Sequence, residues 1–213
     1  MNITIAIDSF KGSLSSLEAG HAIEQGIKHV FPDASVTVRP LADGGEGTVE
    51  ALAFGMGGNI ETITVTGPLG DPVECRYGIL PETNTAILEM SGAAGITLVP
   101  AGMRNPLKTT TYGVGEVICD AIKKGCRRFI VGIGGSATND GGIGMLQALG
   151  FDILDSSGKP VLHGAEGLSH IASISADHVI PELSLCSFQI ACDVNNPLCG
   201  PNGASAIYGP QKG

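Results

Sequence analysis

Short apolar runs and amphipathic segments alternate along the first part of the chain. Residues 3–7 and 35–39 are rich in β-branched side chains, which is typical of buried strands. Between them, apolar side chains recur at helical spacing over residues 14–31, which include a Ser-x-x-Glu capping box. A polar or glycine-rich loop follows each strand, and a helical pattern follows each loop. This order predicts an α/β fold over residues 1–150, with an open sheet of the Rossmann-like or flavodoxin-like type.

The pattern changes at about residues 60–90, where three strand-like runs are separated by turn sequences. Apolar and polar residues alternate over residues 73–79, as in a half-buried antiparallel strand. We therefore expect a β-meander here, within the α/β unit. Helices and strands alternate again afterwards, and a threonine run at residues 109–111 offers N-caps. Residues 151–213 hold a hairpin pattern, a weakly patterned stretch and a last strand, and we expect them to form the incomplete start of a second α/β domain.

Composition and charge exclude several classes of protein. The chain has 12 Lys and Arg against 21 Asp and Glu, a formal net charge of −9, and its basic residues occur at most in pairs. Binding to a nucleic-acid backbone is therefore not expected. Hydrophobic residues make up 43% of the chain, which excludes intrinsic disorder, but no apolar run is long enough to span a membrane.

The cellular compartment is predicted from the first residues and the cysteines. The start of the chain lacks the basic region of a signal peptide, and the six cysteines form no C-x-x-C pair. These features predict a cytoplasmic protein with reduced thiols. The five histidines show no metal-ligand spacing, so a zinc site is not expected.

Glycine is in excess, with 32 of 213 residues, and much of it is concentrated in two segments. Six glycines lie in residues 44–58 and seven in residues 132–150. The sequence Asp-Gly-Gly-x-Gly occurs twice, beginning at Asp43 and at Asp140, each time where a helix is expected to start. Glycine lets a ligand approach the backbone closely. We expect both loops to face one crevice at the carboxyl edge of a sheet, where open α/β proteins bind ligands.

The second glycine-rich segment follows a predicted strand at residues 128–133. Its sequence matches G-x-G-x-x-A, the fingerprint of a dinucleotide-binding loop, but a polar insert delays the helix. A phosphate-binding loop fits better, with Ser136 and Thr138 as hydroxyl donors and Asp140 as a metal or hydrogen-bond partner. A plain glycine-rich turn capped by Asp140 stays open. The predicted cofactor-binding residues are Gly134, Gly135, Ser136, Thr138, Asn139, Asp140 and Gly141.

Polar side chains also follow the other predicted strands. Helix caps or solvated turns explain any one of them. Together they supply what phosphoryl transfer to an alcohol needs: a carboxylate for the hydroxyl proton, a cation for the moving charge and a carboxylate for Mg²⁺. No P-loop or protein-kinase motif occurs. The strand-end residues are Asp8, Ser9 and Lys11, then Asp43, then Asp193 and Asn195, and Arg104 lies in a further polar loop that could hold a substrate carboxylate.

Six sequence blocks lie in order along the whole chain, at residues 8–13, 42–48, 105–106 with 109–113, 132–142, 191–200 and 209–213. Together they resemble the bacterial type I glycerate kinases. The resemblance implies a two-domain α/β protein with its active site between the domains. It also implies Mg²⁺- and ATP-dependent phosphorylation of D-glycerate, at the 2-hydroxyl to give 2-phosphoglycerate, with the 3-hydroxyl left open. Members of the family continue well beyond the last block, so we expect this chain to be an N-terminal portion.

The resemblance assigns no catalytic roles, and the following assignments are hypotheses. Asp193 is the first choice for the base on the glycerate hydroxyl, and Asp43 is the second. Lys11 is expected to balance the developing charge on the phosphate, and Asp140 to lie near Mg²⁺. The predicted substrate-binding residues are Asp8, Ser9, Arg104 and Asn195, with Arg104 and Ser9 on the glycerate carboxylate.

D-glycerate and ATP with Mg²⁺ are thus the expected ligands, and a homodimer is left open. Two other functions are left open as well. A Rossmann-type oxidoreductase would bind a nicotinamide dinucleotide instead of ATP. A non-catalytic fragment would bind a nucleotide without turning it over.

Overall fold

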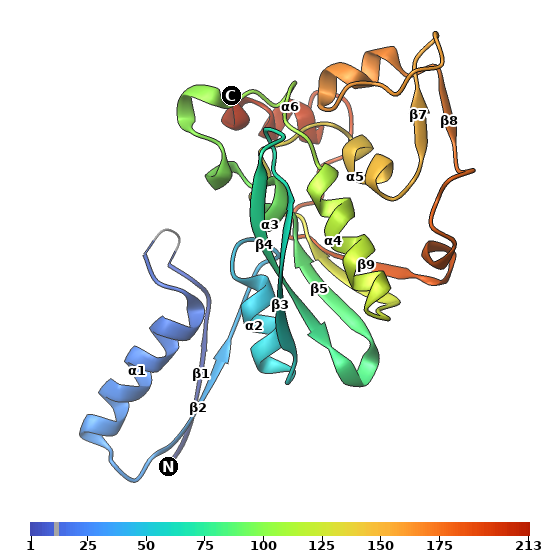
Figure 1. The fold of residues 1–213 in the computed structure, drawn as a ribbon. Coiled ribbons are helices and arrows are strands. Elements are labelled where there is room, and N and C mark those ends of the chain that lie inside the picture. Colours follow the sequence, from blue (N-terminus) through green and yellow to red (C-terminus); the bar gives the residue numbers. More distant parts are fainter. Residues whose placement is uncertain (11–12) are drawn as a thin grey trace.

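The computed structural model describes residues 1–10 and 13–213, and its centre is a five-stranded mixed sheet (Figure 1). The sheet has the order β3-β4-β5-β6-β9. β3, β4 and β5 pair antiparallel, whereas β5, β6 and β9 run parallel. The mixed α/β class and the predicted β-meander are therefore confirmed. The strands are β3 (Asn59–Thr66), β4 (Pro72–Leu80), β5 (Thr85–Glu89), β6 (Arg128–Gly132) and β9 (Ser187–Ala191).

The first two strands form a separate sheet instead of joining the large one. Among the described strands, β1 (Asn2–Ile7) and β2 (Ser35–Pro40) pair with each other, in parallel, and with no other strand, and α1 (Ser16–Val30) packs on them. α2 (Thr48–Gly55) contacts β2 and also packs on β4 and β5, so it lies between the two sheets (Figure 1). The sequence pattern predicts each strand but not which strands pair, because pairing depends on contacts distant in sequence.

Helices cover both faces of the large sheet. α3 (Met90–Ala94) and α4 (Tyr112–Lys123) pack on one face, where Tyr77 and Phe129 are among the largest fully buried side chains. α2 covers part of the other face, where Val49 packs with Leu80 and Ile87. α5 (Ile143–Ala148) packs on α4 and extends the α4 layer away from the sheet.

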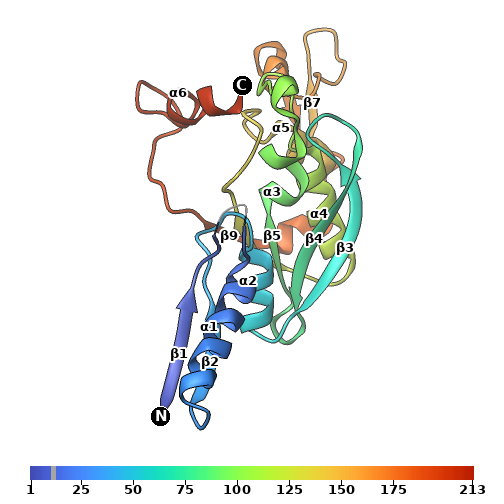
Figure 2. The ribbon, with the colours of Figure 1, turned by 90° about the vertical axis from the view of Figure 1, so that its left-hand side faces the viewer.

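The chain after α5 adds smaller elements at one end of the large sheet. β7 (Asp152–Leu154) and β8 (Ser173–Ser175) pair antiparallel, and α6 (Ala204–Tyr208) lies near the C-terminus (Figure 2). The hairpin pattern at residues 151–161 forms its turn, but β7 pairs mainly with β8. β9 returns to the large sheet beside β6, so that sheet continues past residue 150, where the predicted domain boundary stays a prediction.

Two helix starts test the predicted caps. The Ser15 hydroxyl accepts a hydrogen bond from the Glu18 N–H at 3.2 Å, and Glu18 accepts from the Ser15 N–H at 2.8 Å, so the capping box of α1 is confirmed. Thr111 is the N-cap residue of α4, but its side chain makes no capping hydrogen bond. It is turned instead toward Asp140, a partner that the local sequence does not reveal. Within the described ranges, no helix combines the length and the apolar character needed to cross a membrane.

Candidate active site

Three chain segments meet at the carboxyl edge of the large sheet. The parallel strands β5, β6 and β9 end there at Glu89, Gly132 and Ala191. The loop that begins at Asp43, after β2, packs onto the same edge, because the Gly134 N–H donates a hydrogen bond to the Gly44 carbonyl at 3.1 Å. The first Asp-Gly-Gly-x-Gly loop therefore contacts the start of the second glycine-rich segment.

Glycine is required where these backbones touch. Gly44 has a φ of +90°, and a Cβ there would lie 2.6 Å from the carbonyl oxygen of Ala191. A Cβ on Gly134 would lie 2.9 Å from the Cα of Gly45. Both distances are shorter than van der Waals contact, so a side chain would force the loops apart. Part of the glycine excess thus serves backbone-to-backbone packing between loops at this edge.

The strand-end residues Asp8, Ser9 and Asp43 follow the two parallel strands of the small sheet, at the same edge. Asp8 and Ser9 follow β1, and the Ser9 N–H donates to the Asp8 carboxylate at 2.7 Å. Asp43 follows β2, the parallel neighbour of β1, and its carboxylate accepts from the Gly45 N–H at 2.9 Å. Lys11 lies outside the described residues. This edge of the small sheet therefore carries polar groups next to the glycine contact.

Asp193 and Asn195 follow β9 in an exposed loop. The next residues fold back onto the C-terminal helix, because Tyr208 donates its hydroxyl to the Asn196 side-chain oxygen at 2.7 Å. Ala191, two residues before Asp193, is in the glycine contact with Gly44. Asp193 is thus two residues from the point where the Asp43 loop meets the sheet, and its role as base stays a prediction.

Asp140 is buried and surrounded by donors. One carboxylate oxygen accepts from the Thr111 N–H at 2.9 Å, the Thr111 hydroxyl at 2.8 Å and the Gly144 N–H at 3.3 Å. The other accepts from the Gly142 N–H at 2.9 Å. A metal ion at Asp140 would have to displace some of these contacts, so the geometry favours the hydrogen-bonding role over metal ligation, which stays a prediction.

The predicted Mg²⁺ finds no preformed cluster of protein ligands in the described residues. The described part of the chain contains no group of three or more His, Cys, Asp or Glu side chains that could hold a metal by themselves. Mg²⁺ is usually held by one or two carboxylates together with substrate phosphates, so a preformed cluster is not required. The exposed carboxylates of Asp43 and Asp193 have the oxygen chemistry that Mg²⁺ prefers.

Lys212 is a residue to which the sequence analysis assigned no role. Its ammonium donates to the Ser136 hydroxyl and to the Thr138 carbonyl, both at 2.7 Å. Nearby, the Ser205 hydroxyl donates to the Asn139 side-chain oxygen at 3.0 Å. These hydrogen bonds therefore hold the C-terminal segment against the predicted phosphate loop. The available signal was the last of the six sequence blocks, which contains Lys212.

Arg104 lies beside this segment, because its backbone carbonyl is packed against Gly213. Its loop is closed by Asn105, whose side-chain oxygen accepts from the Leu107 N–H at 3.0 Å. The structure thus brings the loop of Arg104 and the segment of Lys212 together. Both residues are cationic, which suits a site for anionic ligands.

Glu89 is a second residue that sequence reasoning missed. It is buried at the end of β5, where its carboxylate accepts from the Val49 N–H at 2.7 Å and from the Ser91 hydroxyl at 3.1 Å. Burial raises the pKa of Glu89, against the opposing effect of these hydrogen bonds. Glu89 ties the first turn of α2 to the carboxyl edge. A single glutamate at the end of a strand carries no motif that would reveal this.

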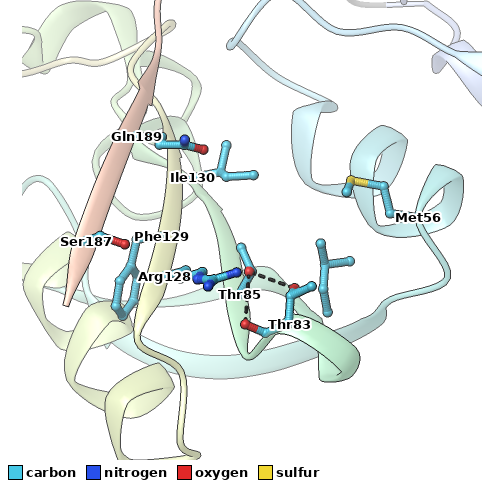
Figure 3. A pocket seen from close by; sticks show the side chains of 9 residues that line it. Met56, Thr83, Thr85, Arg128, Phe129, Ile130, Ser187 and Gln189 are labelled. Carbon is cyan, nitrogen blue, oxygen red and sulfur yellow. Dashed lines mark hydrogen bonds between the residues drawn. The ribbon is translucent and has the colours of Figure 1, made fainter. Parts of the chain in front are cut away.

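A cavity of about 320 Å³ lies elsewhere on the large sheet (Figure 3). Its lining includes Thr85, Arg128 and Ser187, which are the first residues of β5, β6 and β9. These residues mark the amino edge, opposite the loops described above. The side chains of Thr83 and Thr85 are hydrogen-bonded to each other there at 2.8 Å. The cavity is therefore distinct from the candidate active site.

Comparisons with known proteins show the family of the chain and support its overall fold. The profile of the glycerate kinase family matches residues 3–213. A glycerate kinase of Haemophilus influenzae is 54% identical and a glycerate 2-kinase of Escherichia coli is 49% identical, each over 213 residues that are 100% of this chain and 56% of the relative. A crystal structure from Salmonella typhimurium LT2, described as a candidate glycerate kinase 2, superposes with a TM-score of 0.90 at 51% identity, covering 100% of this chain and 57% of that one.

The chain spans about half the length of the curated relatives it matches. The match nevertheless extends over nearly every residue of the chain, including the glycine loops and the C-terminal segment. The chain belongs to the glycerate kinase family.

Proposed function

We propose that this chain serves the ATP-dependent phosphorylation of D-glycerate, with the 2-hydroxyl as the acceptor. The main support is the meeting of three loops at one sheet edge, together with membership of the glycerate kinase family. One loop begins at Asp43, one follows β6, and one follows β9. Phosphoryl transfer depends mainly on positioning and on charge stabilisation, and such an edge can provide both.

In the proposed reaction the glycerate hydroxyl oxygen attacks the γ-phosphorus of ATP while the bond to the ADP oxygen breaks. The hydroxyl proton passes to the Asp193 carboxylate, with Asp43 as the second candidate for this base. Arg104 and the Ser9 region hold the carboxylate of glycerate, and Asp8 and Asn195 contact the rest of the substrate. Mg²⁺, when bound with ATP, neutralises charge on the phosphates.

The loop of residues 134–142 is proposed to hold the ATP phosphates with backbone N–H groups and the Ser136 and Thr138 hydroxyls. Asp140 is proposed to keep this loop in shape by linking it to the start of α4. All six cysteines are free, which suits the reducing cytoplasm in which we place the protein. A homodimer stays a prediction.

The decisive experiment measures ADP release by the 213-residue chain with D-glycerate, ATP and Mg²⁺, and identifies the product by phosphorus NMR. We expect 2-phosphoglycerate to form in step with ADP. If 3-phosphoglycerate forms instead, the acceptor is the 3-hydroxyl. A folded chain that releases no ADP above background would contradict the proposal for this chain.

A second candidate function follows from the length of the chain. Because it spans 56% of its curated relatives, it could bind a nucleotide without completing the reaction. Calorimetry that finds saturable ATP binding together with no turnover would favour this function. Family membership argues against the dinucleotide-dependent oxidoreductase.

A further inference from the structure

Lys212 contacts a loop that is far from it in the sequence. It ends a short 3-10 helix, Pro210–Lys212, after α6, and Figure 2 shows the chain leaving β9 in a wide path before returning through α6 to the C-terminus. The ammonium reaches Ser136 and Thr138, which precede it by 76 and 74 residues. These two residues belong to the loop predicted to hold phosphate. The hydrogen bonds of longest sequence range that the described C-terminal segment makes therefore end in that loop.

The groups that accept hydrogen bonds from the Lys212 ammonium are neutral. Its two hydrogen-bond acceptors are a hydroxyl and a backbone carbonyl, neither of which carries a charge. Burial lowers the pKa of Lys212, and the charge of Asp140 opposes this effect. Asp140 is itself engaged by Thr111, Gly142 and Gly144. A partly buried cation without a directly bonded anion carries a desolvation cost, and an anionic ligand would offset that cost.

The Lys212 ammonium can also donate a further hydrogen bond. A lysine ammonium has three N–H donors, and the two acceptors account for two of them. Other neighbours hold the alternate residues of the loop, since the Gly135 carbonyl accepts from the Ile96 N–H at 2.9 Å and the Ala137 carbonyl accepts from the Thr109 hydroxyl at 2.8 Å. Gly135 and Ala137 are thus bonded to neighbouring segments, whereas Ser136 and Thr138 are bonded to Lys212.

We propose that Lys212 is a phosphate-binding residue of the nucleotide site, and that its ammonium contacts an oxygen of the ATP triphosphate. The inference rests on the proposed function. It places a cation on the loop of residues 134–142, which has no lysine or arginine of its own. Ser136 then has two tasks: its hydroxyl orients Lys212 and lies beside the phosphate.

A purely structural role for Lys212 is the competing explanation, because its hydrogen bonds also fasten the C-terminal segment. Ser205 offers a matched comparison for this role. Its hydroxyl makes a second fastening between the same two segments, through Asn139, and it carries no charge. If Lys212 acted only by holding the C-terminal segment against the loop, loss of the Ser205 hydroxyl would weaken ligand binding in the same way as loss of the Lys212 charge.

The test is calorimetric titration of the 213-residue chain with Mg²⁺ and ATP, with inorganic tripolyphosphate and with adenosine. The variants are Lys212→Met, which keeps an unbranched side chain of similar length, Lys212→Ala and Lys212→Arg. Ser205→Ala controls for fastening, and Lys159→Ala removes an exposed lysine on the turn after β7. Circular dichroism checks that each variant is folded.

We expect Lys212→Met and Lys212→Ala to weaken ATP and tripolyphosphate binding about 10- to 100-fold, the loss typical of a hydrogen bond to a charged group. Adenosine binding should stay unchanged, and Lys212→Arg should keep most of the affinity for ATP because it keeps the charge. Both control variants should bind ATP within about threefold of the unaltered chain, within the small range expected of surface substitutions.

Several results would overturn the inference. One is ATP affinity in Lys212→Met equal to that of the unaltered chain, and another is an equal loss in Ser205→Ala. A parallel loss of adenosine binding would show that Lys212 shapes the site without contacting phosphate. If the unaltered chain binds neither ATP nor tripolyphosphate, the proposed function fails for this chain and the inference fails with it.

Discussion

Asp140 and Thr111 join the two helices beside the candidate phosphate loop. The Asp140 carboxylate accepts both the backbone N–H and the hydroxyl of Thr111, at 2.9 and 2.8 Å. The same hydroxyl accepts from the Met145 N–H at 3.0 Å, in the first turn of α5. The starts of α4 and α5 are thus linked through one buried carboxylate, which fixes the end of the loop.

Replacing Asp140 by Asn should destabilise the fold. The amide would turn an NH₂ group toward backbone donors or leave some of them unpaired in a buried place, at a cost of about 2–3 kcal/mol. Urea unfolding measures the loss. Thr111→Val, which removes only the hydroxyl, should cost less, and the double variant should cost less than the sum because the two residues share one interaction. Unchanged stability in Asp140→Asn would contradict the structural role.

Replacing Gly44 by Ala should separate the loops at the carboxyl edge. Gly44 has a φ of +90°, and a Cβ would collide with the Ala191 carbonyl. Gly47 is a matched control, since its φ is +93° but a Cβ there would meet nothing within 4 Å. Gly47→Ala should therefore cost about 1–2 kcal/mol from backbone strain alone. Gly44→Ala should cost about 1–3 kcal/mol more from overpacking, and equal unfolding free energies would argue against the close contact.

Local patterns in the sequence predict what local interactions determine. The capping box at Ser15 and Glu18 predicts the start of α1, and alternation over residues 73–79 predicts an antiparallel strand. The separate pairing of β1 with β2, and the contacts of Lys212 with a loop more than 70 residues earlier, depend on tertiary structure. Strand-end polarity and the glycine loops predict that these loops meet at the carboxyl edge, where the Asp43 loop does contact the loop after β6, and the active site there stays a prediction. The partners of Asp140 and Glu89 that are distant in sequence, Thr111 and the Val49 N–H, could not be predicted, because no neighbouring residue encodes them.

Glu89 should make stability depend on pH. Its pKa is raised in the folded chain, mainly by burial, so the folded state holds this proton at pH values where the unfolded state releases it. The free energy of unfolding should therefore fall as pH rises from about 4.3, the ordinary value for Glu, through the raised pKa. Glu89→Gln, which has no charge to lose, should lack this part of the fall.

The measurement compares urea unfolding of Glu89→Gln and the unaltered chain between pH 4.5 and 7.5. The contributions of other titrating groups cancel when the two free energies of unfolding are subtracted. The stability of Glu89→Gln relative to the unaltered chain should therefore increase as pH rises. Glu82→Gln changes an exposed glutamate and shows the effect of removing a charge from the surface. A difference for Glu89→Gln that is independent of pH, or that moves the other way, would contradict the prediction.

Replacing Asp193 by Asn tests the proposed base. An amide of the same shape cannot accept the hydroxyl proton, so kcat for ADP release should fall about 10²- to 10⁴-fold. The affinity for ATP measured without Mg²⁺ should be unchanged by calorimetry, because the proposed phosphate contacts are the loop after β6 and Lys212. Asp43→Asn is the matched comparison: its carboxylate also accepts from the Gly45 N–H, so the amide should disturb the glycine contact and lower stability as well. A near-normal kcat in Asp193→Asn with a large loss in Asp43→Asn would move the role of base to Asp43.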